Sequence, residues 1–198
     1  MAIIVDKIQK RKDIALSCKE IIFQSGINNL TISEIAKTAG VGKGTIYDYF
    51  KNKNDIVFEI VNILILERNE LHSAEIAKIS DVQERVKLFY SFFYSEKDIE
   101  LRELYKEFIA ISLTSPDENM LTFQTECFDF HYGEFENIIK EAIEKREIIP
   151  QSLKLAKGMF VFGKGLFITS TSTNAIKDIQ KEIDEHIDAL FELIRIPK

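Results

Sequence analysis

Residues 31–50, TISEIAKTAGVGKGTIYDYF, constrain the local fold of this chain more than any other stretch. Two short runs with helical apolar spacing flank a turn that contains Gly40 and Gly42. Thr31 is followed three residues later by Glu34, which is the capping-box pattern of a helix start. Gly40 suits the left-handed position just past a helix end, and Gly42 is an acceptable N-cap for the next helix. The stretch therefore predicts a helix-turn-helix, the arrangement that can place its second helix in the major groove of DNA.

The second of these helices has one apolar side and several residues suited to DNA. Ile46 and Phe50 lie four apart and anchor the helix to the core. Gly44 lets the helix backbone approach DNA closely, the Thr45 methyl can touch a thymine methyl, and Lys43 can reach guanine. Phosphate oxygens, which position a protein without reading sequence, suit three further side chains: Tyr47, Tyr49 and Lys53.

The charge of the chain is divided between a basic N-terminal part and an acidic remainder. The 198 residues carry a net charge of −6, which by itself argues against nucleic acid. Residues 1–54, however, hold nine of the 26 Lys and Arg residues and five of the 32 Asp and Glu residues, a net of +4, and leave −10 for residues 55–198. This split concentrates the field that attracts phosphate at one end of the chain.

The whole chain is predicted to be all-α, with about nine helices and no alternating strand pattern. One helix is expected over residues 6–25, ending at Gly26, and a long helix begins near Asn52 or Asn54 and runs to about residue 78. The remaining helices are expected at 82–97 with Asp81 as cap, about 98–113, from Ser115-Pro116-Asp117 toward 147, 152–172 and 176–195. We expect two domains: residues 1–54, a three-helix DNA-binding module, and residues 55–198, a helical effector-binding and dimerisation bundle.

Composition excludes several other classes of protein. The chain is 45% hydrophobic and 29% charged, which is typical of a globular, soluble protein. No apolar run is long enough to span a bilayer and the N-terminus does not resemble a signal peptide, so a cytoplasmic location without membrane contact is expected. Cys18 and Cys127 provide neither a disulfide framework nor zinc spacing, and Cys18 is expected to be a small buried thiol. We expect no metal, cofactor or catalytic residue.

The aromatic residues between positions 89 and 135 are too many for one narrow helical stripe. Most of them can be explained as core. The remainder could line an apolar pocket whose few polar groups orient a ligand. The candidate pocket residues are Phe89, Phe93, Tyr105, Phe108, Gln124, Cys127, Phe128 and His131. A ligand there could shift the population away from the state that binds DNA.

Small residues recur every seven positions in the helix expected at 152–172. Gly158, Gly165 and Ser172 would give one side of this helix a smooth strip that allows close helix–helix approach. A two-fold dimer contact is one interpretation, and packing within one subunit is the other.

Residues 10–60 resemble the TetR family of transcriptional regulators. The resemblance rests on these matching pieces: Ile14, Ile21-Ile22, Gly26, Leu30-Thr31, Ile35-Ala36, Ala39-Gly40-Val41, Gly44-Thr45-Ile46-Tyr47, Tyr49-Phe50, Lys51 and Lys53. It implies a homodimer with one DNA-binding module per subunit and an effector pocket in the C-terminal part. It also implies that Thr31 and Lys53 contact the DNA backbone. Gly42 stands where many relatives carry Ser, so a hydroxyl contact to phosphate is lost.

Together these observations predict a transcriptional regulator, a repressor that binds a palindromic double-stranded DNA operator as a homodimer and is released by a small, largely apolar effector. Two alternatives remain. An all-helical bundle enzyme would need a convergent acid–base or metal set, which the sequence does not offer. A helical adaptor that binds protein would not explain the charge split or the second helix with its Tyr and Lys residues.

Overall fold

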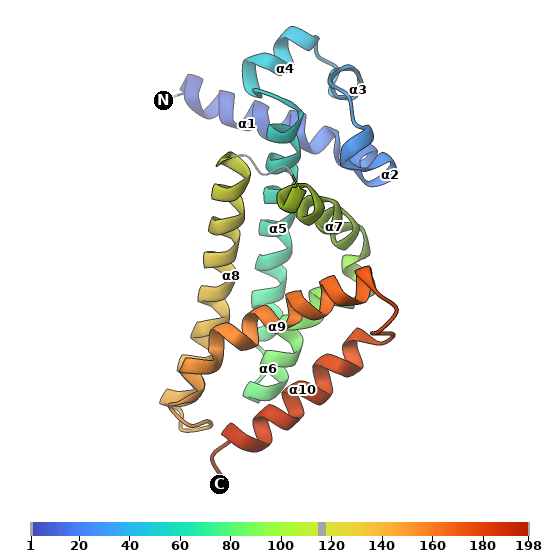
Figure 1. Cartoon of the computed structure of the whole chain (residues 1–198). Helices are drawn as coiled ribbons and strands as arrows, with labels where there is room; N and C mark the ends of the chain where they lie inside the picture. Colours follow the sequence, from blue (N-terminus) through green and yellow to red (C-terminus); the bar gives the residue numbers. More distant parts are fainter. Residues whose placement is uncertain (1, 115–117, 198) are drawn as a thin grey trace. The chain divides into compact units, whose positions relative to one another are not determined.

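The computed structural model describes residues 2–114 and 118–197, and these residues are almost entirely helical. The helices in chain order (Figure 1) are α1 (Ala2–Ser17), α2 (Lys19–Asn29), α3 (Ile32–Thr38), α4 (Lys43–Tyr49), α5 (Lys53–Ile76), α6 (Val82–Phe89), the 3₁₀ turns η1 (Tyr90–Phe93) and η2 (Glu96–Asp98), α7 (Ile99–Thr114), α8 (Glu118–Glu144), α9 (Ser152–Ser172) and α10 (Ile179–Ile194). An isolated antiparallel bridge between Ile148 and Arg195 is the one β feature of the described residues. The predicted all-α fold is confirmed, and ten α-helices are close to the nine expected.

The helix predicted over residues 6–25 is two helices that meet at Cys18. Cys18 has φ −94° and ψ 1°, outside the helical region, and its N–H donates to the Ala15 carbonyl three residues back at 3.0 Å. The Ser17 hydroxyl donates to the Ile14 carbonyl at 2.7 Å, which offers the backbone an alternative to the regular ladder. Gly26, with φ 76° and ψ 167°, breaks the helical conformation at the predicted position. The Cys18 thiol is buried as expected, and burial raises its pKa.

The helix predicted over residues 82–97 is also shorter than expected. α6 starts at the predicted cap, where the Asp81 carboxylate accepts from the N–H groups of Gln83 and Glu84 at 2.9 and 3.2 Å. After Phe89 the chain tightens into η1, where the Tyr90 hydroxyl donates to the Met159 carbonyl at 2.6 Å. Tyr90 is fully buried, so tertiary packing of this aromatic run overrides its helical pattern.

The later helices follow the sequence prediction closely. α9 spans the predicted residues 152–172, and α10 starts where the Asp178 carboxylate accepts from the Lys181 N–H at 3.0 Å. The start signal Ser115-Pro116-Asp117 lies outside the described residues, and α8 is described from Glu118 to Glu144. Within the described part of the chain, no helix combines the length and apolar character that crossing a bilayer requires.

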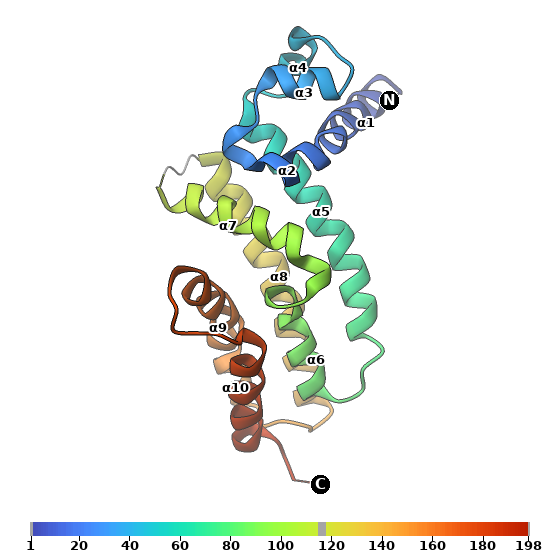
Figure 2. The same cartoon turned by 90° about the vertical axis from the view of Figure 1, so that its right-hand side faces the viewer.

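The chain forms two compact units, each with its own core. The first comprises Met1–Asn69 and Glu100–Phe123, and the second comprises Glu70–Ile99 and Gln124–Lys198. In the first unit, α1–α4 pack around the start of α5 (Figures 1 and 2), and the core includes Ile14, Ile22, Ile35, Ile46, Phe50, Ile56, Leu104 and Phe108. In the second unit, α10 runs back along α9 (Figure 2), and the core includes Val86, Tyr90, Phe135, Ile139, Phe160, Ile183, Ile187 and Phe191. Burial of each such side chain stabilises the fold by about 1.5–3 kcal/mol.

Candidate DNA-binding module and effector region

The first helix of the predicted helix-turn-helix starts with a complete capping box. The Thr31 hydroxyl accepts from the Glu34 N–H at 3.3 Å, and the Glu34 carboxylate accepts from the Thr31 N–H at 3.0 Å. The Thr31 hydroxyl also donates to the Glu34 carboxylate at 2.7 Å. The Thr31 hydroxyl is therefore already used in local hydrogen bonds at the exposed start of α3.

The turn between α3 and α4 closes as the glycines predict. Gly40 has φ 65°, and its N–H donates to the Lys37 carbonyl at 3.2 Å. The next N–H, that of Val41, donates to the Ala36 carbonyl at 3.0 Å, which completes a Schellman motif. Gly42 is the N-cap of α4, with an extended backbone and no side-chain cap. These local bonds fix the direction in which α4 leaves the turn.

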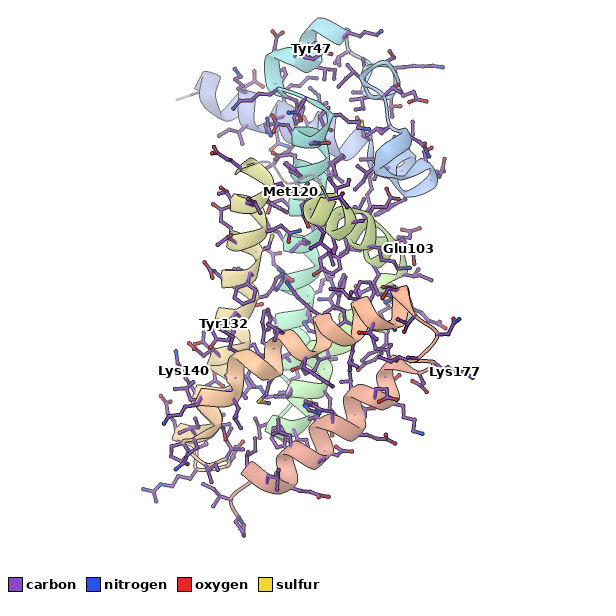
Figure 3. All side chains as sticks on the ribbon, viewed as in Figure 1. Tyr47, Glu103, Met120, Tyr132, Lys140 and Lys177 are labelled. Carbon is purple, nitrogen blue, oxygen red and sulfur yellow. The ribbon has the colours of Figure 1, made fainter. Side chains whose placement is uncertain are left out.

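α4 buries one side and exposes the other. Ile46 and Phe50 are 0% and 2% exposed, which confirms both as anchors. Tyr47 is 60% exposed and lies on the outer side of α4 (Figure 3). The other predicted DNA-contact residues are distributed as follows: Lys43, Gly44 and Thr31 are exposed, and Thr45, Tyr49 and Lys53 are half-buried. A Cβ added at Gly44 would meet nothing within 4 Å, so the backbone of α4 is open to a close neighbour at this point.

Arg11 of α1 contacts the C-terminal end of α4, a contact that the sequence did not predict. Its guanidinium donates from Nη1 to the Tyr49 carbonyl at the end of α4. Its Nε donates to the Glu59 carboxylate of α5 at 2.7 Å, and its guanidinium carbon lies 4.3 Å from the centre of the Phe50 ring. One side chain on α1 thus links the end of α4 to α5. The sequence shows that residues 7–12 are basic, but the hydrogen-bond partners of Arg11 lie 38 to 48 residues away in the chain.

Glu107 makes a second long-range contact within the first unit. Its carboxylate accepts from the Ile27 N–H at 2.7 Å, at the break in α2. A Cβ added at Gly26 would lie 2.5 Å from this carboxylate. Gly26 therefore provides both a backbone conformation and the space that Glu107 of α7 occupies.

The predicted effector residues fall into both units. Phe108 is 2% exposed in the first unit, with its ring centre 5.5 Å from those of Phe58 and Phe123, and Tyr105 is half-buried on the same helix. The second unit holds the other six. The ring centres of Phe89 and Phe128 lie 6.0 and 5.2 Å from the ring centre of Phe160.

The remaining predicted residues of the second unit do not all join this cluster. Phe93 packs on Phe167, with ring centres 5.5 Å apart. Cys127, Gln124 and His131 are half-buried along α8. The Phe108 group within the first unit is best described as core, which was the alternative interpretation of the aromatic residues.

Lys164 is a residue of this region that the sequence reasoning did not include. Its Nζ lies 5.6 Å from the Phe128 ring centre and 5.7 Å from that of Phe160. Burial lowers the pKa of Lys164, and the interaction with Cys127 opposes this only in part. Burial likewise raises the pKa of the Cys127 thiol to about 11. The seven-residue spacing of small residues draws attention to Gly158 and Gly165 of α9. Nothing in the sequence pattern marks Lys164, which lies between them, as a partly buried cation.

The predicted small-residue strip of α9 lies on the surface of this chain. Gly158, Gly165 and Ser172 are exposed, and a Cβ added at either glycine would meet nothing within 4 Å. Val161 and Ile168, on the same side, are each 42% exposed. Packing of the strip within one subunit is thus not observed among the described residues.

The fold and the module define an all-helical protein with an N-terminal helix-turn-helix, the class that binds DNA through an exposed second helix. Residues 18–60 match the family model described as "Bacterial regulatory proteins, tetR family". The chain is therefore related to the TetR family of transcriptional regulators through this N-terminal part, and the resemblance inferred from residues 10–60 is confirmed. Proteins of this kind are regulators, not enzymes, as predicted.

Similar proteins cover the chain to different extents. It is 34% identical over 89 residues to the "Fatty acid metabolism regulator protein" of Bacillus subtilis, over 45% of this chain and 46% of the relative. It is 26% identical over 189 residues to the "HTH-type transcriptional regulator AcrR" of Shigella flexneri, over 91% and 86% of the two chains. The first curated relatives are matched over 30% to 46% of their length.

A crystal structure of the regulator FadR from Bacillus subtilis in complex with stearoyl-CoA has the same fold. The TM-score is 0.69 at 23% identity, and the match covers 90% of this chain and 96% of that one.

Proposed function

We propose that this protein is a homodimeric repressor that acts in the cytoplasm, binds a palindromic operator through α4, and is released by a small, largely apolar effector. The single observation that carries the proposal is the exposed side of α4. Its backbone is open at Gly44, and Lys43 and Tyr47 project outward from a helix anchored by Ile46 and Phe50.

The roles proposed on DNA follow from the chemistry of each group. Lys43 would donate to guanine, and Thr45 would contact a thymine methyl. Tyr47, Tyr49 and Lys53 would contact the phosphate backbone. Thr31 would do so by exchanging the bond from its hydroxyl to Glu34 for one to a phosphate oxygen. Tyr49 of α4 and Lys53 of α5 are half-buried, so each would need a phosphate group that comes close to its own helix. The functional boundary is proposed at residue 54, with residues 1–54 for DNA and residues 55–198 for effector and dimer, although the contact-based units divide the chain differently.

The dimer is proposed to form through the exposed strip of α9. Gly158, Gly165 and Ser172 allow close approach, and Val161 and Ile168 supply exposed apolar surface. A two-fold dimer would present two α4 helices to successive major grooves, about 34–36 Å apart.

The effector is proposed to bind among the aromatic side chains of residues 55–198. The stearoyl-CoA bound by the Bacillus subtilis regulator and the fatty acid metabolism named for the relative support a ligand with a large apolar part. Of the predicted pocket residues, Phe89, Cys127 and Phe128 are the best placed for this role. Phe89 and Phe128 both pack against Phe160, and Cys127 interacts with Lys164, whose Nζ lies over the Phe128 ring.

A binding assay with the DNA upstream of the gene tests the proposal. Fluorescence anisotropy should show salt-sensitive binding with a preference over scrambled DNA. Lys43→Ala should cost about 1–3 kcal/mol of specific binding and relax the preference at one base pair. Lys177→Ala, which removes the same charge from the exposed loop before α10, should leave specificity unchanged. The proposal fails if the wild-type protein does not distinguish the upstream DNA from the scrambled control.

A further inference from the structure

Lys164 occupies an unusual position for a cation in the second unit. It projects from α9 between the rings of Phe128 and Phe160, with its Nζ within 5.7 Å of both ring centres. Phe160 is 4% exposed and is itself surrounded by other aromatic rings: Phe89, Tyr132 and Phe135, with centres 5.7 to 6.0 Å away. The ammonium group therefore lies at the edge of an apolar, aromatic core, of which Tyr132 is labelled in Figure 3.

Lys164 has no anionic partner among the described residues. Two other lysines of the second unit are paired with carboxylates: Lys87 Nζ lies 2.5 Å from Asp188, and Lys140 Nζ lies 2.5 Å from Glu136. The charge interaction of Lys164 is with Cys127, whose thiol has a pKa of about 11 because of burial and is therefore neutral at pH 7. A cation withdrawn from water without a counter-charge is costly, and ring faces compensate only part of that cost.

The neighbours of Lys164 also restrict what could complete the site. The faces of Phe128 and Phe160 are already occupied by an ammonium group, so a cationic ligand would meet repulsion instead of an open aromatic face. An anion would be attracted, and the surrounding rings would accept an apolar chain or ring system.

We propose that Lys164 recognises the anionic head of the effector, and that the effector is an amphiphile with an apolar body and one carboxylate or phosphate group. This inference rests on the proposed function, because it names the ligand class of the same aromatic region. Lys164 fixes the head, and the rings around Phe160 contact the apolar part.

Four probes that share a twelve-carbon chain and differ in their head group test the inference by calorimetry on the full-length protein without DNA. They are dodecanoate, dodecyl phosphate, dodecanol and dodecyltrimethylammonium, each used below its micelle concentration. At least one anionic probe should bind tenfold or more tightly than dodecanol, and the cationic probe should bind most weakly. Whether the carboxylate or the phosphate binds more tightly identifies the natural head group.

Variants assign the preference to Lys164. Lys164→Met should reduce binding of the anionic probe at least tenfold, to the level of dodecanol, and Lys164→Arg should retain the preference. Lys154→Met, on the exposed side of the same helix, is the matched control and should behave as wild type. Thermal melting checks folding, and Lys164→Met should melt at or above the wild-type temperature because it removes an unpaired charge.

Three results would overturn the inference: equal binding of dodecanoate, dodecyl phosphate and dodecanol; a preference for anions that survives Lys164→Met; or no binding of any probe up to its solubility limit. If Lys164→Met does not fold, the wild-type probe series and Lys164→Arg still decide. Operator binding by the ligand-free protein is measured separately. Loss of anion preference with intact DNA binding rejects this inference alone, whereas anion binding without operator binding rejects only the proposed function.

Discussion

Replacing Arg11 with alanine removes the side chain that links the end of α4 to α5. Three contacts are lost at once: the bond to the Tyr49 carbonyl, the ion pair with Glu59, and the stacking on Phe50. Because Arg11 is on α1, its loss leaves every side chain on the outer side of α4 intact. We therefore expect a loss of both stability and DNA affinity without any change in the residues that would touch DNA.

The size of the effect can be estimated from the geometry. The Arg11 and Glu59 side chains are 32% and 18% exposed, so their 2.7 Å ion pair is partly shielded from water and contributes about 1 kcal/mol. The cation over the Phe50 ring at 4.3 Å contributes about 0.5–1 kcal/mol, and a cation at the end of α4 contributes about 0.5 kcal/mol. The total is about 2 kcal/mol, or a fall in melting temperature of about 4–8 °C for a chain of this length.

Thermal melting and anisotropy with operator DNA measure the two expected effects. Lys12→Ala is the matched control, because Lys12 is the neighbouring exposed cation and its substitution removes the same charge without breaking the Arg11 contacts. It should reduce the salt dependence of binding at most slightly and leave the melting temperature unchanged. A double-mutant cycle of Arg11→Ala with Glu59→Ala isolates the ion pair. The reasoning is refuted if Arg11→Ala matches Lys12→Ala in both melting temperature and affinity.

Two glycines give further predictions. Gly26→Ala should destabilise the protein by about 2–3 kcal/mol in thermal or urea unfolding, because a side chain at φ 76° and ψ 167° is strained and the new methyl would lie 2.5 Å from Glu107. An unchanged midpoint would contradict both the strained backbone and the close approach of Glu107. Gly163→Ala should cost about 1–3 kcal/mol, because its methyl would lie 2.5 Å from the Tyr90 ring. Gly165→Ala, in the same helix with open space, should not lower the melting temperature of the monomer, and equal losses for the two substitutions would reject this interpretation.

The helix-turn-helix could be predicted closely because its determinants are local. The capping box joins Thr31 to Glu34, three residues apart, and the turn depends on the positive φ of Gly40. Each of these rules involves residues within one turn of the chain, so the sequence contains all the needed partners. The anchors Ile46 and Phe50 follow from helical spacing in the same way.

The two helix breaks show where local rules lose to other interactions. At Cys18 the apolar spacing continues through the break, and the bond from Ser17 to the Ile14 carbonyl gives no periodic signal. At Tyr90 the apolar residues continue past the break through Phe92 and Phe93, but the Tyr90 ring is fully buried and its hydroxyl donates to the Met159 carbonyl, 69 residues away. Periodicity identifies which residues are apolar together, and it cannot identify the partner that changes their backbone.

α9 shows the same limit for functional residues. Its seven-residue spacing singles out Gly158 and Gly165, which are exposed, whereas the glycine that packing requires within this chain is Gly163, where a Cβ would lie 2.5 Å from Tyr90 and 2.8 Å from Phe93. One residue further along, Lys164 turns toward Phe128 of α8. Gly163 is needed because Tyr90 and Phe93 come close to its backbone, and Lys164 points to a ligand because it has no counter-charge among the described residues. Both conditions are properties of the neighbours, so they become visible only when α8, α9 and η1 are seen together.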